Sequence, residues 1–118
     1  MFSRLSFKAL LVSALCSTNS LSLAALQMET IAEGLDTPWS VAELPDGGFL
    51  VTERPGSIKR VAPSGEMRAV TGVPEVFAKR QGGLFDVVLH PNFAANSTVF
   101  LAYAAGSDDR NQTTVARG

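Results

Sequence analysis

The sequence Gln81-Gly82-Gly83 joins a side chain that both donates and accepts hydrogen bonds to two residues that let a backbone approach a ligand closely. A strongly apolar run, residues 84–89, follows at once and ends at His90-Pro91. This order is typical of a tight turn that enters a buried strand, and also of a ligand site at the mouth of that strand. A neutral amide at Gln81 suits such a site, because it binds a polar ligand without adding charge.

His90 is the only histidine of the chain, and imidazole is a common general base near neutral pH. It stands at the opposite end of the expected strand, about 20 Å from Gln81 at the rise of an extended chain. A structural role, with the ring bonded to a turn carbonyl beside Pro91, is therefore expected for His90.

The acidic residues suggest few further sites. Asp86 is expected in the middle of a strand, where a buried carboxylate needs a polar contact or, alternatively, a metal ion. Glu53 and Arg54 precede a Pro-Gly turn and are expected to be solvated turn residues. Asp108 and Asp109 are too few to hold calcium, which takes six to eight oxygen ligands, so we interpret them as part of a loop.

The first 25 residues have the pattern of a secretory signal peptide. Its parts are a basic start, a short apolar run and a small-residue cleavage triplet: Arg4 and Lys8, residues 9–15, and Ser22-Leu23-Ala24. Cleavage after Ala24 or Ala25 leaves residues 26–118 as the mature domain. Cys16 keeps a lipoprotein open as an alternative.

Removing this leader takes away the only cysteine and two basic residues, which leaves 8 basic and 11 acidic residues and a formal charge of −3. No disulfide then supports the exported domain, so packing or a metal must stabilise it. No basic face indicates nucleic acid as a partner, and nothing predicts stable membrane insertion after cleavage.

The mature sequence follows a β pattern throughout. Eight short strands are expected, at residues 28–33, 39–44, 49–53, 58–62, 67–71, 84–89, 99–104 and 113–117. Pro and Gly recur together between them at intervals of nine residues, in the turns 45–48, 54–57 and 63–66. Such spacing is typical of a sandwich, a barrel or a propeller.

Two features favour the propeller. Residues 39–71 hold four successive strands, the content of one blade, and residues 84–104 begin a second unit at a period near the ~40–50 residues of a blade. Two blades alone would expose much apolar surface, because the runs 87–89 and 99–101 suit strands packed between neighbouring blades. We therefore predict an all-β chain of about two propeller blades, truncated at its C-terminus.

Four motifs resemble the soluble pyrroloquinoline-quinone (PQQ)-dependent aldose sugar dehydrogenases, the glucose/sorbosone dehydrogenase family. In chain order they are Gly34-Leu35-Asp36-Thr37-Pro38-Trp39, Leu44-Pro45-Asp46-Gly47, Leu50-Val51-Thr52-Glu53-Arg54-Pro55-Gly56 and Gln81-Gly82-Gly83-Leu84-Phe85-Asp86-Val87-Val88-Leu89-His90-Pro91-Asn92-Phe93. The resemblance runs from about Gly34 to the end of the chain. It implies a six-bladed β-propeller in the bacterial periplasm or secreted.

The resemblance also implies a reaction: oxidation of an aldose sugar at its anomeric carbon, with PQQ accepting the hydride and calcium as a Lewis acid. Gln81 matches a family glutamine at the active-site mouth and is the expected cofactor-binding residue, with Gly82 and Gly83 shaping the turn. The family's histidine base lies in a later blade, so no catalytic or metal residue is assigned here. The fragment alone is expected to be inactive, and its electron acceptor is unassigned.

Two other classes of function remain open at this point. A non-catalytic extracellular propeller that binds carbohydrate or protein is the main alternative, because a fold does not determine a function. A lactonase-type hydrolase on a six-bladed propeller would need clustered acidic metal ligands, and residues 26–118 show no such cluster.

Overall fold

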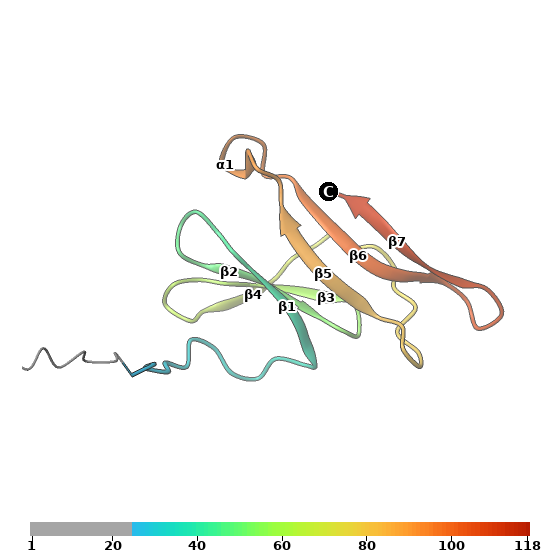
Figure 1. The fold of residues 1–118 in the computed structure, drawn as a ribbon, viewed down its shortest axis with the longest axis horizontal. Coiled ribbons are helices and arrows are strands. Elements are labelled where there is room, and N and C mark those ends of the chain that lie inside the picture. Colours follow the sequence, from blue (N-terminus) through green and yellow to red (C-terminus); the bar gives the residue numbers. More distant parts are fainter. Residues whose placement is uncertain (1–24) are drawn as a thin grey trace, which may run out of the picture.

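A computed structural model describes residues 25–118, so the expected leader lies outside the described residues except for Ala25. The described part is built from two antiparallel sheets, which confirms the all-β prediction (Figure 1). Within this part, no helix is long and apolar enough to cross a membrane.

The first sheet is a meander of four strands in the order β1-β2-β3-β4. Its strands are β1 Pro38–Glu43, β2 Phe49–Glu53, β3 Ser57–Val61 and β4 Met67–Ala69. The expected Pro/Gly turns connect them. Gly47 has a φ of 80°, which glycine adopts at little cost, and its amide donates to the Leu44 carbonyl across the first turn.

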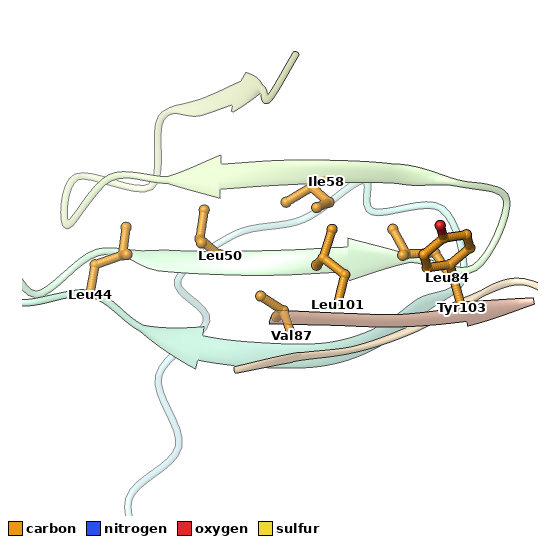
Figure 2. Close-up of a cluster of buried hydrophobic side chains, with 7 residues drawn as sticks. All are labelled: Leu44, Leu50, Ile58, Leu84, Val87, Leu101 and Tyr103. Carbon is orange, nitrogen blue, oxygen red and sulfur yellow. The ribbon is translucent and has the colours of Figure 1, made fainter. Parts of the chain in front are cut away.

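The second sheet has the order β5-β6-β7. It contains β5 Leu84–Leu89, β6 Val99–Gly106 and β7 Asn111–Arg117, and the short helix α1 Phe93–Asn96 lies between β5 and β6. The sheets face each other across a core, with side chains contributed by both. The buried cluster consists of Leu44, Leu50, Ile58, Leu84, Val87, Leu101 and Tyr103 (Figure 2).

Two strand irregularities meet where the sheets come together. The register of β1 shifts between Pro38 and Ser40, and that of β5 shifts between Leu84 and Val87. The rings of Trp39 and Phe85, one from each irregular stretch, pack with their centroids 5.5 Å apart. This contact lies on the same side of the core as the entrance to β5.

Several expectations about the elements need correction. Residues 28–33 form no strand, because no strand within residues 25–118 pairs with them, and Met28 is 88% exposed. They instead run as an extended segment beside the β3–β4 turn, where the Ile31 carbonyl approaches Gly65. The helix α1 was not expected, and β7 begins two residues earlier than residue 113.

The outer face of the second sheet has no cover within the described residues. Val88 and Val115 are 58% and 70% exposed, whereas Val87 and Leu101 on the inner face are 4% and 6% exposed. The continuous apolar runs of β5 and β6 therefore have one buried face and one open face.

Candidate functional site

Gln81 lies in the loop that enters β5, and its side chain is exposed. The loop borders a surface hollow of about 320 Å³. Ten residues line this hollow: Phe77, Lys79, Arg80, Gln81, Gly82, Phe85, Ala104, Asn111, Gln112 and Thr113. The hollow therefore combines two cationic side chains and three amides with two aromatic rings.

Backbone hydrogen bonds hold this loop against the second sheet. The amide of Phe77 donates to the Ala104 carbonyl at 2.8 Å, and the amide of Ala104 donates to the Gly83 carbonyl at 2.9 Å. Inside the loop, the Gly82 amide donates to the Lys79 carbonyl at 2.8 Å. Gln81 is thus presented by a short tight turn between two anchored ends.

Close backbone packing explains the two glycines. A Cβ atom at Gly82 would lie 2.2 Å from the Phe77 carbonyl oxygen. A Cβ atom at Gly83 would lie 2.5 Å from Cγ of Arg54 and 2.7 Å from its carbonyl oxygen. No side chain fits at these distances, so both glycines shape the loop, and neither supplies a chemical group.

Arg54 is not the solvated turn residue that was expected. Its Nε donates to the Gly82 carbonyl at 3.1 Å, and its Nη2 donates to the Arg80 carbonyl. Its backbone carbonyl also accepts the Leu84 amide at 3.0 Å. The first sheet therefore reaches across to the Gln81 loop through this one residue.

Glu53 was also expected to be solvated, but it is 3% exposed. Its Oε1 accepts the Asp36 amide at 2.7 Å, and its Oε2 accepts the Ser57 hydroxyl and lies 3.8 Å from Nζ of Lys59. Burial raises the pKa of this carboxyl, but the Ser57 hydroxyl, the Asp36 amide and the Lys59 charge outweigh it and hold the pKa below its ordinary value of 4.5. Through its bond to the Asp36 amide, Glu53 links the segment before β1 to the end of β2.

Asp108 belongs to the turn between β6 and β7, as expected for a loop residue, and pairs with Lys79 at 2.7 Å. Both side chains are more than half exposed. The pair joins the β6–β7 turn to the Gln81 loop, although an exposed ion pair of this kind adds little stability.

His90 follows the last residue of β5, at the opposite end of that strand from Gln81, and Figure 1 shows α1 beside this end of β5. Its Nδ1 accepts the Asn92 amide at 3.0 Å and lies 3.1 Å from the Asn96 side-chain nitrogen. The ring also stacks on Phe100 with centroids 6.1 Å apart. The observed partner is an amide, and not the turn carbonyl that was expected, but the contacts are those of a turn-stabilising residue.

Asp86 lies within β5 as expected, but its side chain is exposed and not buried, at the stretch where the register of β5 shifts. Among residues 25–118, no group of three or more His, Cys, Asp or Glu side chains is placed to hold a metal ion.

A larger hollow of about 510 Å³ lies elsewhere, between the extended segment 29–35 and the outer face of the first sheet. Apolar side chains such as Ile31, Val41 and Val61 predominate in its lining. Polar residues form a smaller part of its lining than in the Gln81 hollow, where five of the ten lining residues carry a charge or an amide, so the Gln81 hollow is the better candidate despite its smaller volume.

Comparison with known proteins agrees with this geometry. The family model described as glucose/sorbosone dehydrogenase matches residues 35–118. The aldose sugar dehydrogenase YliI of Escherichia coli is 39% identical over 113 residues, which are 92% of this chain and 30% of that protein. An uncharacterized protein of Synechocystis is 41% identical over 97 residues, which are 74% of this chain and 23% of that protein.

Solved structures show the same relation. The apo form of the soluble aldose sugar dehydrogenase of Escherichia coli aligns with a TM-score of 0.70 at 39% identity, over 76% of this chain and 27% of that one. The PQQ-bound aldose sugar dehydrogenase of Streptomyces coelicolor aligns with a TM-score of 0.65 at 34% identity, over 75% of this chain and 26% of that one. The chain thus spans less than a third of the length of these relatives.

The two sheets accordingly correspond to about two blades of the all-β propeller, as predicted, and the matched residues include the whole Gln81 hollow. The chain belongs to the glucose/sorbosone dehydrogenase family.

Proposed function

We propose that this chain forms part of an enzyme that oxidises aldose sugars at the anomeric carbon with PQQ as the electron acceptor, and that Gln81 contacts the cofactor or the sugar. The observation that carries the proposal is the presentation of Gln81. Arg54 binds the carbonyl groups of Arg80 and Gly82, the residues before and after Gln81, while the Gln81 side chain is exposed at the rim of the hollow. A fixed backbone that carries a free polar side chain is the arrangement expected of a binding residue.

The hollow fits an anionic, planar cofactor. Arg80 supplies positive charge, Lys79 lies beside it in its pair with Asp108, and the amides of Gln81, Asn111 and Gln112 supply donors and acceptors. When bound, PQQ would supply a quinone that accepts two electrons from the sugar. The residues of this hollow would bind and orient it. The assignment of calcium stays a prediction from the family resemblance.

Removal of hydride from the sugar also requires a group that takes the proton from the anomeric hydroxyl. Among the described residues His90 is the only histidine, and it is engaged at the far end of β5. We therefore assign the base to a residue outside this chain, and expect the 118-residue polypeptide to show no turnover on its own.

Export to the bacterial periplasm is part of the same proposal. It rests on the sequence pattern of residues 1–25 and on the solved Escherichia coli relative, which is described as soluble. Fractionation of cells that produce the protein, with N-terminal sequencing of the product, tests cleavage after Ala24 or Ala25.

Activity is tested by dye reduction with glucose after PQQ and calcium are added. The assay compares the 118-residue chain with the longest polypeptide encoded at the same locus. We expect turnover only in a polypeptide that supplies the base. Turnover by the 118-residue chain would refute the assignment of the base to another segment, and absence of turnover and PQQ binding in both would favour a non-catalytic binding propeller.

The role of Gln81 is tested with Gln81→Ala in the longest polypeptide. The matched control is Gln27→Ala, which removes another exposed glutamine at a position far from Gln81 in the sequence. Loss of one or two hydrogen bonds to a charged cofactor should weaken PQQ binding or raise KM by about tenfold. PQQ titration and steady-state kinetics measure both. Equal affinity and KM in the two variants would remove Gln81 from the site.

A further inference from the structure

The side chain of Arg54 binds the loop on both sides of Gln81. Its guanidinium donates to the carbonyl of Arg80 and to that of Gly82, the residues immediately before and after Gln81. The Arg80 carbonyl belongs to the peptide bond between Arg80 and Gln81, and the Gly82 carbonyl belongs to the peptide bond between Gly82 and Gly83. The two acceptors therefore flank the Gln81-Gly82 pair. A guanidinium holds its N–H groups in a rigid plane, so two acceptors bound at once are fixed relative to each other.

The backbone of Arg54 is itself hydrogen-bonded on both sides. Its backbone amide donates to the Thr37 carbonyl and its backbone carbonyl accepts the Leu84 amide, each at 3.0 Å. One residue therefore joins the chain before β1, the start of β5 and the loop between residues 79 and 83. The lack of a side chain at Gly83 provides the space through which Arg54 passes.

The loop needs this support, because Arg80 has a φ of 55°. A residue other than glycine is strained in that left-handed conformation and persists there only where its surroundings hold it. The bond from Arg54 to the Arg80 carbonyl acts on that strained residue. Without it, the turn would relax and the direction of the Gln81 side chain would change.

We propose that Arg54 is a positioning residue, which sets the direction of the Gln81 amide at the hollow by clamping the carbonyl groups on both sides of it. Arg54 is not among the residues that line the hollow, so it acts through the loop and not on a ligand. The functional half of this inference rests on the proposed function, in which Gln81 contacts the cofactor or the sugar.

The first experiment measures the loop itself. Hydrogen exchange in the 118-residue chain is compared for the unchanged protein, Arg54→Lys, Arg54→Ala and the control Arg60→Lys, which alters a surface arginine paired with Asp46. A lysine ammonium cannot span both carbonyls as the planar fork does. We expect the amides of Gly82 and Leu84 to exchange about tenfold faster in Arg54→Lys, with β2 and β3 unchanged.

Unchanged exchange in residues 79–84 of Arg54→Lys would overturn the clamp. Faster exchange throughout both sheets, to the same degree, would overturn it as well, because Arg54 would then stabilise the whole fold and not the loop. If Arg54→Ala fails to fold, the lysine variant carries the test. These outcomes do not depend on any cofactor, so they stand even if the chain binds no PQQ.

The second experiment tests the functional half in the longest polypeptide encoded at the locus. PQQ affinity and KM are measured for Arg54→Lys, Gln81→Ala and the double variant. A residue that acts through Gln81 should lose its effect once Gln81 is absent. We expect about tenfold weaker binding or higher KM in each single variant, and no further loss in the double variant. Additive losses would show that Arg54 acts independently of Gln81 and would overturn the proposal.

Discussion

The hydroxyl of Thr52 donates a 2.6 Å hydrogen bond to the carbonyl oxygen of Phe85 and thereby joins β2 of the first sheet to β5 of the second. Thr52 is fully buried, and its oxygen also accepts the Ser40 amide of β1 at 3.1 Å. Phe85 lies in the stretch where the register of β5 shifts. One buried hydroxyl thus connects three strands beside the entrance to the Gln81 loop.

Thr52→Val should lower the free energy of unfolding by about 1–3 kcal/mol, because valine keeps the volume but leaves the Phe85 carbonyl and the Ser40 amide without this partner. Urea denaturation measures the change. Thr71→Val, at an exposed position, is the control and should stay within about 0.5 kcal/mol of the unchanged protein. Equal losses in both variants would show that the inter-sheet bond contributes nothing.

The buried Glu53 carboxylate predicts a dependence of stability on pH. Its pKa lies below the ordinary 4.5, so its contribution is present above that value and is lost as the pH falls through the lower pKa of the folded state. Glu53→Gln should therefore be less stable than the unchanged protein at neutral pH, and the difference should shrink below about pH 4.5. Denaturation at several pH values between 7 and 3 measures this difference.

The control for Glu53 is Glu66→Gln, because Glu66 also pairs with a cation but is 61% exposed at its side chain. That substitution should change stability by less than about 1 kcal/mol at every pH. A Glu53→Gln difference that stays constant between pH 7 and pH 3 would contradict the assigned role of the carboxylate.

Local patterns were sufficient for most of the strands. The Pro/Gly turns and the apolar runs identified residues 49–53 and 84–89 with the bounds that the structure shows. They failed for residues 28–33, whose alternation resembles a strand but whose backbone pairs with no strand in the described part of the chain. A strand requires a partner, and that requirement is not visible in a local window.

The burial and the hydrogen-bond partners of Glu53 and Arg54 could not be predicted from the sequence for the same reason. The Pro-Gly turn after them indicates that both side chains are exposed to solvent. Their partners are distant in the sequence, however: the Asp36 amide lies 17 residues from Glu53, and the carbonyls bound by Arg54 lie 26 and 28 residues away. Only the folded chain brings these partners together. Gln81, by contrast, is marked locally by its two glycines, so its loop was predictable although the clamp that holds it was not.

Gly83→Ala should destabilise the protein by about 1–3 kcal/mol, because its Cβ atom would overlap with Arg54 at 2.5 Å and 2.7 Å. It should also loosen the Gln81 loop as Arg54→Lys does. The control is Gly72→Ala, since Gly72 has a φ of 79° but open space around it, and therefore bears only the cost of the dihedral angle. Thermal denaturation compares them, and a loss at Gly83 no larger than that at Gly72 would disprove the steric argument.

The Nδ1 atom of His90 accepts the Asn92 amide beside α1 and so stabilises that turn. An asparagine carbonyl oxygen offers a similar acceptor, so His90→Asn should retain most of the stability, whereas His90→Ala should lose about 1 kcal/mol. In the longest polypeptide, neither substitution should alter PQQ affinity or turnover by more than about twofold, since β5 separates this turn from Gln81. Denaturation and dye reduction measure the two effects. A turnover loss of about a hundredfold with unchanged stability would make His90 the proton acceptor after all.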